Sequence, residues 1–194
     1  MGQDKALLPF GDKTLLEYLI EWMRPVFDET LVIVDQKSKL QGLDLQGVKV
    51  YEDWIREQGP LAGIYTGLCF SKTRANCIFT CDMPWVDQDL IEELIEFWEK
   101  DIDVVCLEDP KGKLQPFPGI YDRQCRYLIR LALEEGETSV QDFLRVVTIK
   151  PLVLTQEKIH LLTNMNTIED YYGALKEKEK KEELKNETNF IASE

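Results

Sequence analysis

The chain has 194 residues, enough for one domain with a full core and too few for two substantial domains. Apolar residues make up 44% and charged residues 30%, which excludes wholesale disorder and collagen-like repetition. The net charge is -13, so the surface repels phosphate backbones and anionic headgroups. We therefore do not expect a nucleic-acid binder. The longest apolar stretches, such as 30–34, are far shorter than the roughly 18 residues that a spanning helix needs, so we do not expect a membrane protein either.

The cysteines are odd in number, contain no Cys-x-x-Cys pair, and accompany a single histidine, His160. This pattern argues against a zinc site and against a disulfide framework. It suits small buried residues in a reducing cytosol, so we expect a cytoplasmic protein. The five are Cys69, Cys77, Cys81, Cys106 and Cys125.

Apolar residues at helical spacing predict a first helix that begins near Leu15 and stops before Pro25. Continuous apolar runs then predict strands at 31–34, 48–51, 77–80 and 104–107. Runs of this kind are typical of strands covered on both faces, which favours a parallel sheet.

Helical patterns separate the predicted strands. Gly59-Pro60 opens one helical segment that continues through Phe70, with proline where a first-turn residue needs no hydrogen bond. The alternation predicts a doubly wound α/β domain with a three-layer α/β/α architecture and a Rossmann-like, mostly parallel sheet. Two further helix faces are predicted, one from Leu90, Ile91, Leu94, Ile95 and Trp98, and one from Tyr127, Leu128, Leu131 and Ala132.

The composition changes at Lys176, where alternating lysines and glutamates carry no apolar stripe. We interpret residues 1–175 as the folded domain and 176–194 as a charged tail, either an exposed helical extension or a frayed end.

Asp82 is the most informative single position, because it follows an apolar strand and directly precedes Met83-Pro84. Ligands of doubly wound sheets bind where strands end in this way. A carboxylate there can hold a hard cation against the phosphates of a ligand. The alternative is an aspartate that caps the helix near Asp87.

A second carboxylate, Asp53, follows the strand that ends at Tyr51 and precedes Gly59-Pro60-Leu61-Ala62-Gly63. Two carboxylates suffice for magnesium, which takes one or two of them together with substrate phosphates and water. The glycines permit close backbone approach, and exposed amides at a helix start can meet an anion or a base edge. The alternative is a glycine-rich turn before a closely packed helix.

Other polar residues have ordinary interpretations as well. Lys5 can be a solvated lysine, and Asn164-Met165-Asn166-Thr167 reads first as a helix cap whose two amides could also bind a polar ligand. Ser139 is available to cap a helix after Gly136.

Four segments in one order are far more specific than any one of them: Met-Gly-x-Asp-Lys-Ala-Leu-Leu, Glu-Asp-x(5)-Gly-Pro-Leu-Ala-Gly, Cys-Asp-Met-Pro and Asn-x-Asn-Thr-x-Glu-Asp. Over residues 1 to about 172 the chain resembles the molybdenum cofactor guanylyltransferases. The resemblance implies a glycosyltransferase-A-like nucleotidyltransferase that joins GMP from GTP to molybdopterin, with Mg²⁺ as its metal. It also implies transient contact with other molybdenum-cofactor proteins.

The resemblance further assigns roles by position. Asp82 matches the magnesium ligand, Asp53 the second acid of the nucleotide site, and Lys5 the lysine that holds the GTP phosphates. The helix start at Gly59, Pro60 and Leu61 belongs to the nucleotide site, and Asn164 and Asn166 match a motif on the pterin side.

Two departures from the family pattern stand out. Asp35 lies where relatives often carry an asparagine beside the guanine. Relatives also open with an apolar strand and a Leu-Ala-Gly-Gly-x-Ser-x-Arg segment, and none of this precedes Met1. We expect such a strand and loop before Met1, because a sheet without its central strand would expose the apolar flanks of 31–34 and 77–80.

Two other functions remain open from the sequence. One is a related nucleotidyltransferase, the cytidylyltransferase of the same pathway. The other is a non-catalytic module that binds molybdopterin or nucleotide.

Overall fold

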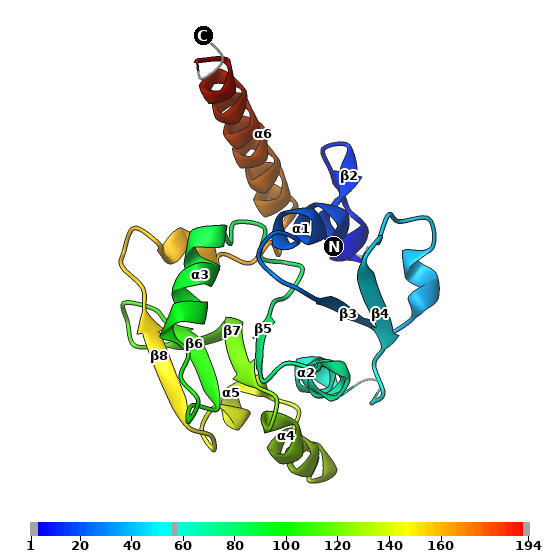
Figure 1. The fold of residues 1–194 in the computed structure, drawn as a ribbon, viewed down its shortest axis with the longest axis vertical. Helices are drawn as coiled ribbons and strands as arrows, with labels where there is room; N and C mark the ends of the chain where they lie inside the picture. Colours follow the sequence, from blue (N-terminus) through cyan, green and yellow to red (C-terminus); the bar gives the residue numbers. More distant parts are fainter. Residues whose placement is uncertain (1–3, 56–57, 192–194) are drawn as a thin grey trace.

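A computed structural model describes residues 4–55 and 58–191, and the side chains as far as residue 180 (Figure 1). The strands are β1 (Pro9–Phe10), β2 (Lys13–Thr14), β3 (Thr30–Val34), β4 (Val48–Glu52), β5 (Ala75–Ile78), β6 (Val104–Glu108), β7 (Leu114–Asp122) and β8 (Ile149–Val153). The helices are α1 (Leu15–Met23), α2 (Gly59–Phe70), α3 (Gln88–Phe97), α4 (Cys125–Glu134), α5 (Val140–Phe143) and α6 (Ile168–Ile191), with short 3₁₀ turns η1 (Lys5–Leu7), η2 (Lys37–Leu40) and η3 (Ile159–Leu162). The predicted α/β class is confirmed.

Most predicted elements lie where the patterns place them. Thr14 caps α1 in a reciprocal capping box with Glu17, and Ser139 caps α5 by accepting the amide of Asp142. The strand predicted at 77–80 lies earlier, because pairing with β7 ends at Ile78 and the chain then turns.

The strands form a mixed arrangement. β3 and β4 are parallel, and a four-stranded sheet has the order β5-β7-β6-β8. Within that sheet β7 is antiparallel to both neighbours, while β6 and β8 are parallel. The sequence patterns predict neither β7 nor β8, and they favour a mostly parallel sheet. The direction of a buried strand cannot be read from an apolar run, because buried strands of either direction look alike in sequence.

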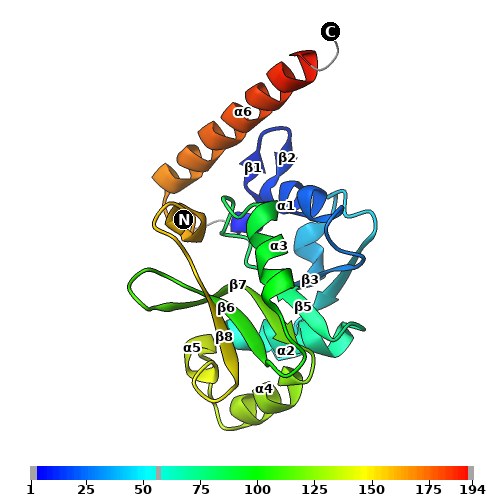
Figure 2. The same ribbon diagram turned by 60° about the vertical axis from the view of Figure 1, so that its left-hand side comes forward.

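Alternate residues of β6 point into two different hydrophobic clusters. Val104 and Cys106 pack with α2, α4 and α5, whereas Val105 and Leu107 pack with α3 on the opposite face. Helices therefore cover both faces, as Figure 2 shows, and give the predicted three layers. The pair β3 and β4 has α1 on one face and α2 on the other.

Within the described residues, no strand pairing joins the β3–β4 sheet to the four-stranded sheet. In Figure 1, β3 and β5 lie on either side of the centre, and in the described part of the chain no strand pairs with the edge of either that faces the other. Every residue of β3 is only half-buried, although the run is wholly apolar after Thr30. The strand expected before Met1 stays a prediction.

Hydrogen exchange can test this unpaired edge. The carbonyl of Val34 accepts the amide of Asp53, so Val32 and Val34 turn their peptide groups toward β4. Peptide groups alternate along a strand, so those of Leu31 and Ile33 turn toward the open edge. We expect the amides of Leu31 and Ile33 to exchange at least about tenfold faster than those of Val32 and Val34. Equal protection of all four amides would mean that this edge is paired in solution.

The helix α4 forms where predicted but presents a different face to the core. Cys125, Ile129 and Leu133 are buried, whereas Tyr127, Leu128 and Leu131 are exposed. The predicted face was therefore wrong. Apolar residues occur on both sides of this helix, and packing on α2 decides which of them are buried.

The last helix, α6, is continuous from Ile168 to Ile191 and projects from the body, as Figures 1 and 2 show. It crosses the predicted boundary at residue 175 without a break. No helix in the described part of the chain has the length and apolar character needed to cross a bilayer.

Candidate functional site

Three of the predicted site residues meet in one cluster. The Nζ atom of Lys5 lies 3.5 Å from Oδ2 of Asp82 and donates a hydrogen bond of 2.8 Å to Oδ1 of Asn166. The side chains of Lys5 and Asp82 are 27% and 21% exposed, so solvent can reach both. Lys5 is thus not merely solvated, and segments 161 positions apart in the chain share one site.

Backbone hydrogen bonds hold this cluster in place. The carbonyl of Asp82 accepts the amide of Met165 at 2.7 Å, and the Met165 side chain is wholly buried. Asp4 caps η1 by accepting the amide of Ala6, which fixes the turn that carries Lys5. Met1 to Gln3 of the same motif lie outside the described residues.

The carboxylate of Asp82 is only partly used. Its Oδ1 atom is buried and has no hydrogen-bond partner within the described structure. The helix-cap alternative is excluded, because Asp87 caps α3 by accepting the amide of Leu90. A buried carboxylate oxygen without a partner is costly, and a bound hard cation would satisfy it. The surroundings of Asp82 therefore fit its predicted role as a metal ligand.

Among the described residues, no group of three or more His, Cys, Asp or Glu side chains is placed to hold a metal ion. Such a group is not required for Mg²⁺, which completes its shell with water and substrate phosphates. The neighbouring thiol supplies no nucleophile, because burial raises the pKa of Cys81 to about 11.

Asp170 is a supporting residue to which the sequence assigned no role. Its Oδ2 accepts the amides of Asn166 and Thr167, and its own amide donates to Oγ1 of Thr167. These hydrogen bonds, from the Thr167 amide first, lower the pKa of Asp170. Thr167 is thus the helix cap. Asn166 is free to face Lys5, and Asn164 is exposed beside it.

Asp53 lies in a separate part of the site. Its Oδ1 accepts hydrogen bonds from the Thr66 hydroxyl at 2.7 Å and from the Ile55 amide at 3.2 Å. A Cβ atom on Gly63 would lie 4.0 Å from Oδ2, so α2 approaches this carboxylate closely. The structure shows no contact between Asp53 and Asp82, and the pairing of the two acids on one ion is not observed.

An open pocket of about 580 Å³ adjoins Asp53. The rings of Tyr51 and Phe70 stack at 3.7 Å, and the half-exposed ring of Trp54 meets Phe70 edge-on at 4.8 Å. A pocket of this size can take a drug-sized ring system. The sequence alone does not single out these aromatic residues, because they come from β4, the loop after it and α2 and form no local motif. The lining residues are Lys37, Tyr51, Glu52, Asp53, Trp54 and Phe70.

The first turn of α2 contains Gly59, Pro60 and Leu61, as predicted. Gly59 has a φ of +67°, which favours glycine, and the Leu61 side chain is fully buried. The Leu61 side chain is therefore not available to a ligand, whereas Pro60 is exposed but has no N–H to offer. The nearby Gln58 side chain has a buried oxygen without a partner in the described structure.

Asp35 is paired with a cation. Its Oδ2 lies 2.5 Å from Nζ of Lys39, which is also 3.9 Å from Asp4. The hydrogen bond from Lys39 lowers the pKa of Asp35, so the carboxylate is charged at neutral pH. The end of β3 is thereby linked by charge to the turn that carries Lys5.

The family profile described as a MobA-like NTP transferase domain matches residues 1–152. The chain belongs to this family. A protein of Carboxydothermus hydrogenoformans named "Probable molybdenum cofactor guanylyltransferase" is 34% identical over 181 residues, 91% of this chain and 89% of that one. A protein of the same name from Flavobacterium johnsoniae is 28% identical over 88% of this chain and 87% of its own length.

Solved structures show that the fold matches as well. Molybdopterin-guanine dinucleotide biosynthesis protein A from Archaeoglobus fulgidus superposes with a TM-score of 0.77 at 19% identity, covering 92% of each chain. A 2-C-methyl-D-erythritol 4-phosphate cytidylyltransferase from Thermus thermophilus superposes with a TM-score of 0.67 at 17% identity, covering 90% of this chain and 93% of its own. At these identities the likeness establishes the fold shared by MobA-like transferases and this cytidylyltransferase.

Proposed function

We propose that this MobA-like chain transfers GMP from GTP to molybdopterin, releasing pyrophosphate and forming the guanine dinucleotide form of the molybdenum cofactor. The observation that carries the proposal is the cluster of Lys5, Asp82 and Asn166, which joins the phosphate-side and pterin-side motifs at one point. The relatives of the same name support the choice of reaction. We place the reaction in the cytoplasm, with transient contact with other molybdenum-cofactor proteins.

The attacking group is the terminal phosphate of molybdopterin. A phosphate monoester is largely dianionic at neutral pH because its second pKa is about 6, so no general base is required. A phosphate oxygen forms a bond to the α-phosphorus of GTP, and the bond from that phosphorus to the bridging oxygen of the β-phosphate breaks. Both bonding electrons leave with pyrophosphate.

The difficulty of this reaction is to bring two anions together, so catalysis consists of positioning and charge neutralisation. In our proposal the ammonium of Lys5 binds the phosphates of GTP, and Asn164 and Asn166 hold the pterin side. Asp82 would hold Mg²⁺, which when bound neutralises charge on the triphosphate. No histidine or thiolate is needed, in keeping with the neutral thiol of Cys81.

The nucleoside of GTP is assigned to the region between Asp53 and the first turn of α2. The N–H groups of Gly59 and Leu61 can read a base edge or meet an anion. The pocket beside Asp53 supports this assignment by its size and its aromatic lining.

Nucleotide selectivity tests the proposal. By titration calorimetry in the presence of Mg²⁺, we expect GTP to bind at least about tenfold more tightly than CTP or ATP, a difference of about 1.4 kcal/mol. Preference for CTP would instead support the cytidylyltransferase. Tight GTP binding without formation of the guanine dinucleotide from molybdopterin would support a non-catalytic binding module, and equal affinities would leave only a generic triphosphate site.

A further inference from the structure

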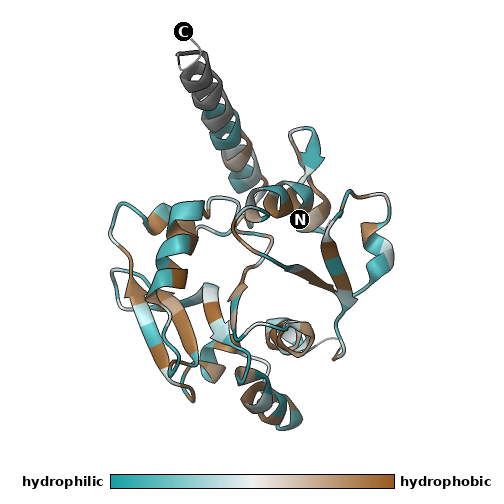
Figure 3. Cartoon of the chain, in the orientation of Figure 1, coloured by the Kyte–Doolittle hydropathy of each residue, from teal (hydrophilic) through white to brown (hydrophobic). Residues whose placement is uncertain are grey.

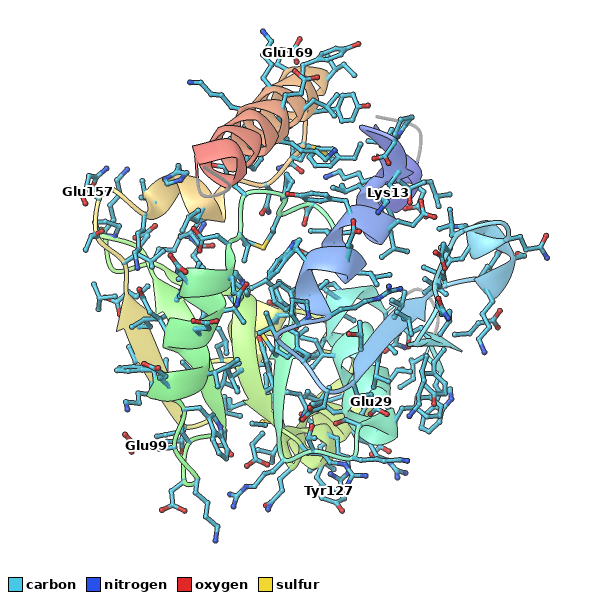
Figure 4. All side chains as sticks on the ribbon, turned by 45° about the horizontal axis from the view of Figure 1, so that its top comes forward. Lys13, Glu29, Glu99, Tyr127, Glu157 and Glu169 are labelled. Atoms are coloured by element: carbon cyan, nitrogen blue, oxygen red, sulfur yellow. The ribbon has the colours of Figure 1, made fainter. Side chains whose placement is uncertain are left out.

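The outer face of α4 is apolar and largely exposed. The guanidinium of Arg126 lies 4.3 Å from the centre of the Tyr127 ring and donates a hydrogen bond of 2.7 Å to its hydroxyl. Tyr127, Leu128 and Leu131 are exposed by 61%, 43% and 57%, and they lie on one side of the helix at spacings of three and four residues. Figure 4 shows Tyr127 at the edge of the molecule, away from the body. Scattered single apolar residues on a surface are ordinary, but three that form a continuous stripe on one short helix indicate contact with another surface.

The charges around this stripe are arranged against the stability of the isolated helix. Arg123 and Arg126 lie at its N-terminal end, and Glu134 and Glu135 at its C-terminal end. The helix dipole favours the reverse order, with acids first and bases last. The one ion pair along the helix, between Arg130 and Glu134 at 2.8 Å, also has the less favourable order. Charges of the opposite sign on a second surface would offset this unfavourable order.

We propose that the outer face of α4 binds the same face of a second copy of this chain, with the two helices antiparallel about a twofold axis. The antiparallel arrangement brings the arginine end of each helix against the glutamate end of the other. Tyr127 of each copy meets Leu131 of the other, the reciprocal contact that a twofold interface requires. A parallel arrangement would oppose like charges, which excludes it.

The position of α4 leaves the candidate active site free. In Figure 1, α4 lies at the opposite end of the molecule from α6, and Figure 3 shows its apolar bands on the periphery. A helix of ten residues is about 15 Å long, so the interface is small. Small interfaces are transient, and we expect self-association in the micromolar range.

Sedimentation velocity from about 1 to about 200 µM protein tests the proposal directly. We expect the wild-type chain to convert from monomer to dimer over this range. Leu131→Glu should weaken association at least about tenfold, because it places two like charges, one from each copy, near the axis in a site that must become dry. Ile95→Glu is the matched control, since Ile95 is a 42% exposed apolar residue on α3, and it should associate like wild type. Circular dichroism checks that both variants fold.

Charge reversal separates this interface from general apolar adhesion. Arg126→Glu and Glu135→Arg should each weaken association severalfold. The double variant should restore it, because the reversed charge at position 126 of one copy then faces the reversed charge at position 135 of the other. The double variant also places an acid at the N-terminal end of the helix and a base at its C-terminal end, which the helix dipole favours. A failure of this variant to associate could therefore not be attributed to loss of folding. A chain that stays monomeric at 200 µM, an unaffected Leu131→Glu variant, or a double variant no better than the singles would overturn the proposal.

Discussion

Asp82→Asn is expected to lower the rate of GMP transfer by about 10³-fold while the protein stays folded. The substitution keeps the shape of the side chain and removes its charge. In the proposed site this carboxylate faces Lys5 and offers a second, unpartnered oxygen to a cation. Loss of the charge removes the ligand that would hold Mg²⁺ at the triphosphate, so the effect falls on turnover. Steady-state kinetics with GTP, Mg²⁺ and molybdopterin measure it.

Thermal unfolding separates a catalytic role of Asp82 from a structural one. A buried carboxylate oxygen without a partner costs stability, so Asp82→Asn should have an unfolding midpoint equal to or above that of wild type. Asp101→Asn is the matched control, because Asp101 is an exposed loop acid. Turnover near that of wild type in Asp82→Asn, or a large fall in its unfolding midpoint, would remove the assignment.

The structure also shows what local patterns can and cannot reveal. The capping box of Thr14 and the apolar runs of β3, β4 and β6 are local signals, and each element forms where its signal lies. The strand β7, which was not predicted, and the buried face of α4 depend on packing partners far away in the chain. No periodicity within one segment carries that information, because the same apolar stripe can face the core or a second molecule.

In the candidate site, too, some residues can be found from local motifs and others cannot. Asp82, Lys5 and Asn166 are recognisable because short motifs surround them, and the structure brings these three together. The supporting role of Asp170 and the aromatic pocket beside Asp53 arise from tertiary contacts, which have no local spacing. Asp53 also accepts a hydrogen bond from Thr66, thirteen residues away on α2, and no local pattern predicts this contact.

Lys5→Met is expected to lower kcat/KM for GMP transfer by about 10² to 10³-fold. Methionine keeps most of the length of the side chain and removes the ammonium that faces both Asp82 and Asn166. In a reaction between two anions, a positive charge at this point stabilises the transition state directly. Lys5→Arg should recover part of the activity, since it restores the charge without the compact geometry of an ammonium.

A structural alternative for Lys5 is a bridge that merely ties η1 to the Asn164–Asn166 segment. Partly exposed ion pairs of this kind contribute little to folding, so a bridge would give a small change in stability and a small change in rate. Lys13→Met is the matched control, because Lys13 pairs with Glu21 at 2.7 Å on the exposed surface and should tolerate the change. A double-mutant cycle with Asn166→Ala adds a second test. If Lys5 and Asn166 act as one unit on the reacting phosphates, their effects on kcat/KM are not additive, whereas independent effects would mean that their 2.8 Å hydrogen bond has no part in the reaction.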